Sequence, residues 1–222
     1  MTLTLWTVSG APSPWRVALG MAFKGIESET RLLSASRREH KSESYLKLND
    51  RGTVPTLKSG ALARGHSVAI LAWLDRAYPD APLFGETPED AGRIWQRAMD
   101  IFDHLPPATS GVLGPIFFNG VREATDALQE AAERLRAELA RLTAILEDTP
   151  YLGGAHAGAP DAIAFPHVRL LQRAIDTQPE LMAALGLGEL KVVSPQLADW
   201  VVRIEALPGV AETFPPHWAE AA

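Results

Sequence analysis

Three short segments in the first third of the chain have residue types and positions that suit recognition of a small peptide-like ligand. The first is Val54-Pro55, which stands directly before a predicted strand. A proline there cannot donate to the sheet, and such X-Pro bonds are the ones that adopt the cis form. We predict that Pro55 is cis and that the backbone N–H and C=O of Val54 pair with an extended peptide as an added strand. The alternative is a trans proline that only opens an edge strand.

The second segment is His66-Ser67, immediately before a predicted helix. Unsatisfied N–H groups and the helix dipole favour an anion at this position, so a ligand carboxylate could bind there. Serine is also a common N-cap. Ser67 could serve both purposes.

The third segment is the loop at residues 9–14, Ser-Gly-Ala-Pro-Ser-Pro, between a predicted strand and a predicted helix. A hydroxyl donor near a helix N-terminus could stabilise a bound thiolate and so lower the pKa of a thiol. Neither Ser9 nor Ser13 is expected to be a nucleophile, because the sequence has no nucleophile elbow and no Ser-His-Asp spacing. Taken alone, these serines are loop and capping residues.

Other kinds of chemistry are disfavoured by composition. The chain has 222 residues, no cysteine and a formal charge of -6. The lack of cysteine excludes disulfides and any thiol of the protein's own, and the negative charge disfavours nucleic acid. The six histidines show no spacing typical of a metal site. No apolar run is long enough to cross a membrane and the N-terminus has no signal-peptide pattern, so we expect a cytoplasmic protein without a membrane partner.

The three segments are positioned by a predicted β-α-β unit, a polar excursion and a β-β-α unit. Polar and apolar residues alternate at 2–6 and 26–32, and a helix is expected from Pro14 to Gly25. Residues 34–52 are the excursion, with one weak helical patch. VPTL and ALAR flank the Ser59-Gly60 turn as a hairpin, and a helix follows at 67–78. This order is thioredoxin-like.

The second part of the chain is predicted to be all helical. A linker rich in proline and glycine follows Pro79, and Thr87-Pro88 is a helix start signal. We place a thioredoxin-like domain at 1–79 and a helical domain at 88–222. Helices are expected at about 122–147, with a leucine stripe, and at about 161–174, 178–186 and 194–206.

One apolar run in the helical part is a candidate wall for a hydrophobic substrate. Its most useful members are Ile116 and Phe117, in the cluster Val112, Leu113, Ile116, Phe117 and Phe118. Such runs are more often core than pocket, and that alternative stays open.

Four segments in this order resemble the glutathione transferase superfamily over nearly the whole chain. SPWRVALGMAFKGI is similar to the first helix of serine-type members, notably the zeta class. LNDRGTVPTL resembles the segment Asn-Pro-x-Gly-x-Val-Pro-x-Leu, with Asp50 where proline is usual. GHSVAILAWLDRAYP resembles the Glu/Gln-Ser-x-Ala-Ile helix, and GAPDAIAFP the capping box of the C-terminal domain, with Gly158 where serine or threonine is usual.

The resemblance implies that glutathione is the co-substrate and lies extended on the first domain. Its cysteinyl unit would pair with the backbone of Val54 beside cis-Pro55, and its γ-glutamyl carboxylate would meet Ser67. Lys41, in the excursion, would meet the glycyl carboxylate. Family members have Glu or Gln before that serine, whereas His66 accepts a hydrogen bond only when neutral.

The residue five positions before Arg16, where the family's activating serine stands, is Ala11. The activating hydroxyl then comes from Ser13 or Ser9, or activation relies on backbone N–H groups and the helix dipole. We predict Ser13, because it stands directly before Pro14 at the expected helix start, whereas Ser9 belongs to the strand-loop junction. The alternative is that Ser13 only caps the helix.

The resemblance implies an enzyme that adds the glutathione thiol to a small hydrophobic electrophile, as in detoxification, and that works as a homodimer. One alternative is a zeta-like cis-trans isomerase of the maleylacetoacetate type. Another is a catalytically silent glutathione-binding or ligand-carrying protein. A thiol-disulfide oxidoreductase is disfavoured, because the nucleophile of such enzymes is a cysteine.

Overall fold

Contacts along the chain divide it into two compact units. The computed structural model describes residues 2–219. The first unit holds the residues up to Thr87 together with those from Ala206 onward, and the second runs from Pro88 to Glu205. The C-terminal segment, which we assigned to the helical domain from sequence, therefore belongs with the first unit by its contacts.

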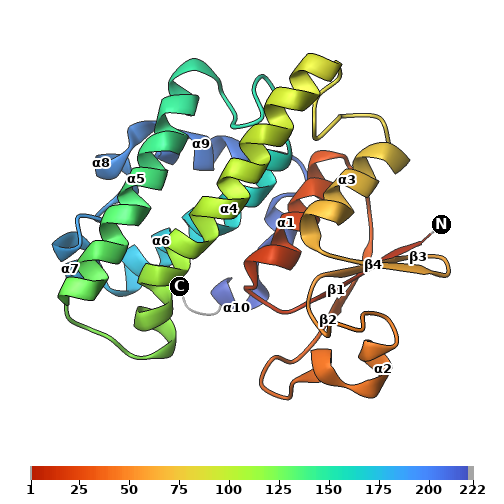
Figure 1. The fold of residues 1–222 in the computed structure, drawn as a ribbon, viewed down its shortest axis with the longest axis horizontal. Helices are drawn as coiled ribbons and strands as arrows, with labels where there is room; N and C mark the ends of the chain where they lie inside the picture. Colours follow the sequence, from red (N-terminus) through yellow and green to blue (C-terminus); the bar gives the residue numbers. More distant parts are fainter. Residues whose placement is uncertain (1, 220–222) are drawn as a thin grey trace. The chain divides into compact units, whose positions relative to one another are not determined.

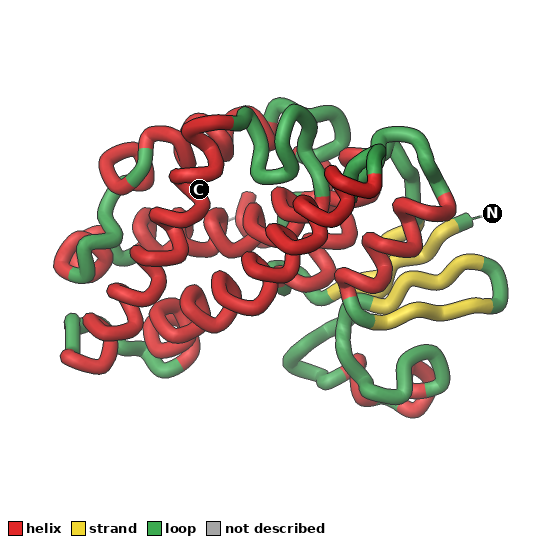
Figure 2. Tube along the Cα trace, turned by 45° about the horizontal axis from the view of Figure 1, so that its top comes forward, coloured by secondary structure: helices red, strands yellow, loops and turns green. Residues whose placement is uncertain are grey.

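The first unit is built on a four-stranded mixed sheet in the order β2-β1-β3-β4, drawn in yellow in Figure 2. β1 pairs with β2 in parallel and with β3 in antiparallel, and β3 and β4 form the predicted hairpin. The strands are β1 Leu3–Thr7, β2 Glu29–Leu32, β3 Thr56–Ser59 and β4 Leu62–Gly65. This arrangement confirms the thioredoxin-like fold expected from the sequence.

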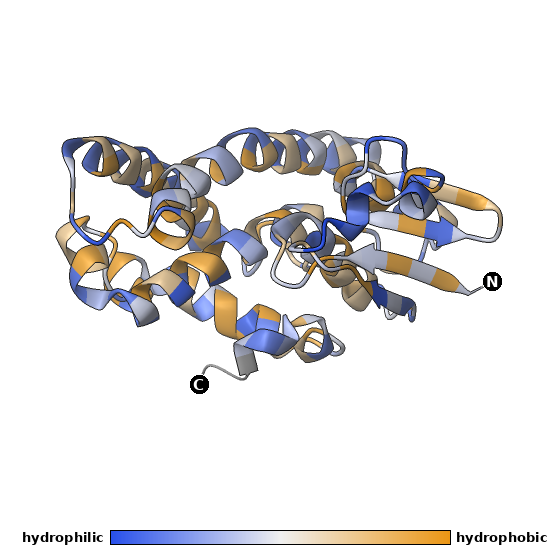
Figure 3. Ribbon diagram, turned by 90° about the horizontal axis from the view of Figure 1, so that it is seen from below, coloured by the Kyte–Doolittle hydropathy of each residue, from blue (hydrophilic) through white to orange (hydrophobic). Residues whose placement is uncertain are grey.

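Two helices pack on one side of this sheet: α1, Pro12–Phe23, and α3, Ser67–Ala77 (Figure 1). Successive side chains of β1 point to opposite faces of the sheet, so Leu3 and Leu5 point toward the two helices. Figure 3 shows the resulting alternation of hydrophobic and hydrophilic residues along the strands. The buried core cluster consists of Leu3, Leu5, Val17, Met21, Leu57, Ile70 and Leu74. On the other side of the sheet lies the excursion, with the 3-10 helix η1, Glu39–Lys41, and the short helix α2, Glu43–Leu46.

The first helix begins two residues earlier than predicted. Pro12 occupies the first helical position, where a missing N–H costs nothing, and Ala11 is the N-cap without a side-chain hydrogen bond. Gly25 follows the helix with φ +62, a left-handed conformation that glycine adopts without strain, as expected for a helix end.

The second unit is all helical, as predicted, and is built around α4, Pro88–Phe118, which packs against both α5, Asp126–Asp148, and α6, Ala159–Thr177. The leucine stripe predicted from the sequence lies on α5 and is buried along its full length, at Leu128, Leu135, Leu139, Leu142 and Leu146. The remaining helices of this unit are α7 Pro179–Ala184, α8 Leu190–Val193 and α9 Pro195–Glu205. Within residues 2–219, no helix is both long and apolar enough to cross a membrane.

Asp161 organises the N-terminus of α6. It is fully buried and accepts hydrogen bonds from the backbone N–H groups of Leu152, Gly153 and Gly158 and from the indole N–H of Trp200, all at 2.8–2.9 Å. Burial raises the pKa of the Asp161 carboxyl, and these four donors oppose that effect. Because Gly158 has no side chain, only one half of the expected capping box exists, the hydrogen bond from Gly158 N–H to the Asp161 carboxylate. The same carboxylate links α6 to α9 and to the loop before α6.

The C-terminal segment contains the 3-10 helix η2, Ala211–Thr213, and α10, Pro216–Ala219. Its anchor in the first unit is Trp15, whose indole Nε1 donates to Thr213 Oγ1 at 2.9 Å. The Trp15 ring also packs edge-on against Phe214 and Trp218, each at 5.2 Å between centroids. These contacts explain why the segment clusters with the first unit.

Replacing Asp161 with alanine should destabilise the protein by about 3–5 kcal/mol, because four N–H donors lose their common buried acceptor. The free energy of unfolding from urea denaturation measures this. Asp176→Ala is the matched control, since Asp176 is an exposed carboxylate on the same helix. Equal losses in the two variants would contradict the structural role of Asp161.

Candidate functional site

The strand register brings the three segments singled out from the sequence to one edge of the sheet. Trp6, near the end of β1, pairs with Thr56, the first residue of β3, and Thr56 pairs with Gly65, the last residue of β4. The loop after β1, the loop before β3 and the turn into α3 must therefore lie next to one another. The loop after β1 is at least 40 positions from the other two segments in the sequence.

The bond between Val54 and Pro55 is cis, as predicted. Pro55 and the first residue of β3 are buried, and Val54 is half-buried. Neither backbone group of Val54 is hydrogen-bonded to another of the described residues. One N–H and one C=O are therefore available to an extended ligand, the pairing that β-augmentation uses.

A polar network behind Val54 fixes the loop before β3. The Tyr45 hydroxyl donates to Thr53 O at 2.7 Å and lies 2.7 Å from Thr56 Oγ1. Asn49 Nδ2 donates to Thr53 O at 2.9 Å and to Thr56 Oγ1 at 3.1 Å. Burial raises the pKa of the Tyr45 phenol, so this hydroxyl keeps its proton. The excursion thus holds the residues on both sides of Val54-Pro55.

Lys41 lies in the excursion, where its Nζ donates to Arg51 O at 3.0 Å. Gly52, with φ +56, allows this close approach: a Cβ there would lie 2.8 Å from both His40 O and Lys41 Cδ. The ammonium group of Lys41 is exposed and keeps donors for a ligand carboxylate. The structure does not by itself bring Lys41 to Val54.

Ser67 is the first residue of α3 rather than its N-cap, which corrects the capping role considered from sequence. The N-cap position is His66, at φ +64 and ψ +109, without a side-chain cap. A positive φ is costly for histidine, by about 1–3 kcal/mol, and such strain gathers at ligand sites. Ser67 Oγ is buried and accepts a 2.7 Å hydrogen bond from Arg16 Nη1.

Arg16 is a residue of the candidate site that we did not identify from sequence. It is 1% exposed, and burial lowers its pKa to about 10, so it is still protonated at neutral pH. Its guanidinium ties α1 to the start of α3 and leaves the Ser67 hydroxyl proton free to be donated to a ligand. The only sequence signal was an arginine within an apolar helix face.

Ser13 lies on the face of α1 that also carries Arg16 and Gly20, three and seven residues later, and this face packs against α3. Its Oγ has no hydrogen-bond partner among the described residues. Pro12 and Pro14 lack an N–H, and the N–H of Trp15 donates to Ala11 O. The first turn therefore offers a ligand two donors, the backbone N–H and the hydroxyl of Ser13, and Ser13 is not the N-cap.

Ser9 is engaged elsewhere. Its Oγ lies 2.6 Å from Nδ1 of His217, on α10, 208 positions later in the chain. Gly10, with φ +76, makes room for this contact, because a Cβ there would lie 3.0 Å from the His217 ring. The Ser9 hydroxyl has a single proton, which is shared with or oriented by His217. No local pattern in the sequence indicates this pair.

The residues of the predicted apolar wall on α4 differ in how far they are exposed to solvent. Val112, Leu113 and Ile116 are at most 4% exposed. Ile116, at 1%, is thus a core residue, the alternative left open from sequence, and it offers no surface to a substrate. Phe117 and Phe118 are 38% and 88% exposed. Of the two residues predicted to contact substrate, only Phe117 presents apolar surface.

Tyr45→Phe should cost about 1–2 kcal/mol of unfolding free energy, because Thr53 O and Thr56 Oγ1 each lose a buried partner. Chemical denaturation measures the loss. Tyr78→Phe is the control: Tyr78 makes a ring contact with Trp73, but its hydroxyl has no hydrogen-bond partner in residues 2–219. If both variants were as stable as the parent protein, the network would not hold the loop.

Comparisons with known proteins show the family to which both parts of the chain are similar. Residues 11–77 match the family model described as glutathione S-transferase, N-terminal domain, and residues 125–203 match glutathione S-transferase, C-terminal domain. Glutathione S-transferase A of Pleuronectes platessa is 27% identical, over 98% of this chain and 93% of that protein. A glutathione S-transferase structure from the Antarctic clam Laternula elliptica has a TM-score of 0.84 at 27% identity, covering 99% of this chain and 95% of that one.

The zeta subtype suggested by the sequence is not confirmed. A maleylacetoacetate isomerase of Dictyostelium discoideum is 35% identical, but over only 31% of this chain and 32% of that protein. Both family models together cover well over half of the chain, at residues 11–77 and 125–203. The chain belongs to the glutathione S-transferase family.

Proposed function

We propose that this glutathione transferase binds glutathione along the sheet edge where its three loops meet and transfers the thiol to a small electrophile. The observation that carries the proposal is the register of β1, β3 and β4. It sets the unpaired backbone of Val54, the Ser67 hydroxyl and the first turn of α1 around one position. A tripeptide with two carboxylates and one thiol needs these three kinds of partner.

The peptide part of glutathione is held at Val54 and Ser67. The cysteinyl N–H and C=O pair with the backbone of Val54 as a short added strand. The γ-glutamyl carboxylate accepts from the Ser67 hydroxyl, with Arg16 behind it adding positive charge. His66 receives the γ-glutamyl ammonium when its imidazole is neutral, and Lys41 receives the glycyl carboxylate.

Ser13 activates the thiol. Its hydroxyl and its backbone N–H both donate to the sulfur, at the positive end of α1, and both interactions favour thiolate over thiol. The thiolate then attacks an electrophilic carbon with its electron pair and forms the C–S bond. In a substitution, the group that leaves takes the electrons of the broken bond. In an addition to a conjugated double bond, the π electrons move to the neighbouring carbon, and that carbon takes a proton from water.

The electrophile is small and hydrophobic, and Phe117 is the residue of the predicted apolar wall whose ring is partly exposed and available to it. An isomerase of the maleylacetoacetate type is the second candidate, since its thiolate adds reversibly to a conjugated double bond. The partial similarity to such an enzyme over 31% of the chain favours it. A silent glutathione-binding protein is the third. Turnover of a chloroaromatic compound and of a maleyl compound with glutathione separates the three.

We also propose that the enzyme is a cytoplasmic homodimer. Sedimentation equilibrium at micromolar concentration tests the assembly, and cell fractionation tests the location. A mass of 24.0 kDa, that of the single chain, would exclude the dimer.

Ser67→Ala should weaken glutathione binding by about 1–3 kcal/mol, the loss expected for a hydrogen bond to a charged group. Calorimetric titration of the folded variant measures the dissociation constant. Ser59→Ala, at the far end of β3, is the control for serine removal. An unchanged affinity in Ser67→Ala would leave Ser67 with a structural role toward Arg16 alone.

Ser13→Ala should raise the pH at which the thiol of bound glutathione ionises. The reason is that the Ser13 hydroxyl stabilises the thiolate more than the thiol, and the variant loses this stabilisation. The ultraviolet absorbance of the thiolate, followed against pH in the complex, reports this ionisation. Ser9→Ala is the matched control and should leave it in place. The reverse result, a shift in Ser9→Ala alone, would assign activation to Ser9 and its partner His217.

A further inference from the structure

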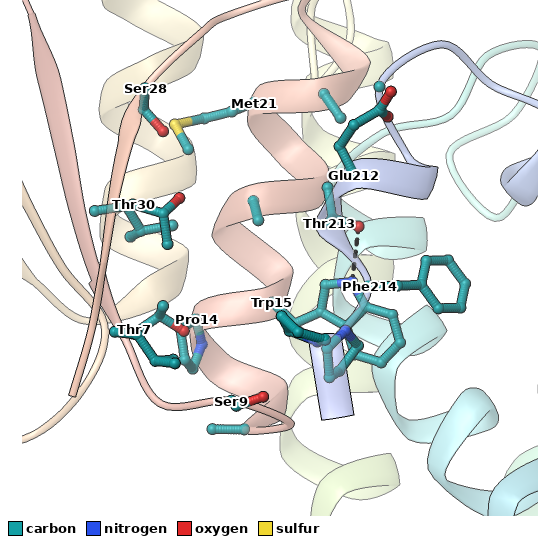
Figure 4. Close-up of a pocket in the computed structure, with 18 of the residues that line it drawn as sticks. Thr7, Ser9, Pro14, Trp15, Met21, Ser28, Thr30, Glu212, Thr213 and Phe214 are labelled. Carbon is teal, nitrogen blue, oxygen red and sulfur yellow. Dashed lines mark hydrogen bonds between the residues drawn. The ribbon is translucent and has the colours of Figure 1, made fainter. Parts of the chain in front are cut away.

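A groove of about 700 Å³ lies within the first unit, on the side of α1 away from Arg16 and Ser67. Its floor is the helix-facing side of β1 and β2, its inner wall is α1, and its outer wall is the C-terminal segment. Figure 4 shows the groove with Thr7, Thr30 and Met21 on one side and Phe214 on the other. Every residue that lines it belongs to this unit.

Small side chains and an uncovered strand make the groove. Ala18 and Ala22 face it from α1, and Gly209 approaches Ala22 from the C-terminal segment, where a Cβ would lie 3.5 Å from that of Ala22. All four residues of the edge strand β2 are exposed. Leu32 lines the groove and is 59% exposed, so its apolar side chain is available for contact with a ligand. The volume and the apolar lining suit a drug-sized molecule.

The charges of the groove are all of one sign. The ionisable residues among those that line it are Glu27 and Glu212, and neither carboxylate is ion-paired within residues 2–219. In Figure 4, Glu212 lies at the same end of the groove as Ser28, and Ser9 lies at the opposite end. The end near Ser28, the neighbour of Glu27, is also the C-terminal end of α1, where the helix dipole is negative.

This charge pattern separates the groove from the glutathione site. Glutathione and its conjugates carry two carboxylates against one ammonium, so their net charge is negative and Glu27, Glu212 and the negative end of α1 would repel them. An organic cation with an apolar body fits the groove better. Its ammonium group would lie at the acidic end, and its apolar body would cover Leu32, Ala18 and Phe214.

We propose that this groove is a second ligand site, distinct from that of glutathione, and that it binds hydrophobic amines in their cationic form. The Ser28 and Thr30 hydroxyls, which have no hydrogen-bond partner among the described residues, are available to the ammonium or to polar substituents of the ring. The site binds such amines without transforming them.

Three probes that share the naphthalene ring and carry a cationic, a neutral or an anionic substituent test the proposal: 1-naphthalenemethylamine, 1-naphthalenemethanol and 1-naphthoate. Calorimetric titration of the whole protein at neutral pH and low salt gives each dissociation constant. The amine should bind most tightly and the carboxylate most weakly. Saturating glutathione should leave the affinity of the amine unchanged. Equal or tighter binding of the carboxylate would overturn the proposal, and so would competition by glutathione.

Variants locate the site. Each of Glu27→Gln and Glu212→Gln should weaken the amine about two- to fivefold, as expected for exposed ion pairs, and leave the alcohol unaffected. Glu29→Gln is the matched control, because Glu29 lies on the same strand as Thr30 but on the opposite face of the sheet. Thr30→Trp fills the groove and should abolish binding of the amine and the alcohol. Unchanged amine binding in Thr30→Trp would show that the amine binds elsewhere.

Discussion

The antiparallel pairing of β3 with both β1 and β4 is the constraint on which the candidate site depends. Because Trp6, Thr56 and Gly65 are neighbours across three strands, the chain segments just beyond them must meet at one edge of the sheet. A shift of the register by one residue would also turn Leu57 out of the core. Hydrophobic packing therefore fixes the geometry of the polar site.

Two sets of polar interactions make this arrangement specific. The Arg16 guanidinium finds its acceptor at Ser67 only when α1 and α3 are in their observed alignment. The Tyr45 hydroxyl and the Asn49 amide meet Thr53 and Thr56 only when the excursion is folded against the loop before β3. Each interaction adds little net stability, whereas breaking one leaves a buried group unsatisfied. These contacts of the protein itself therefore fix the arrangement of the site.

Local patterns in the sequence predicted the elements well. The strands, the hairpin, the cis peptide bond and the leucine stripe of α5 agree with expectation, because each rests on periodicity or on one residue's backbone preference. The start of α1 was misplaced, since Pro12 and Pro14 both suit a first turn. Ser67 was taken as a cap because its buried partner, 51 positions earlier, leaves no local signal. The packing of His217 against Ser9 could not be predicted for the same reason.

The central claim is that one sheet edge binds glutathione and that α1 presents Ser13 to its sulfur. The most direct measurement is a crystal structure of the protein with glutathione bound. The account predicts that the cysteinyl unit is hydrogen-bonded to the backbone of Val54, that the γ-glutamyl carboxylate lies against Ser67, and that the sulfur is within hydrogen-bonding distance of Ser13 Oγ. Glutathione bound away from Val54, or a sulfur that contacts Ser9 instead of Ser13, would contradict it.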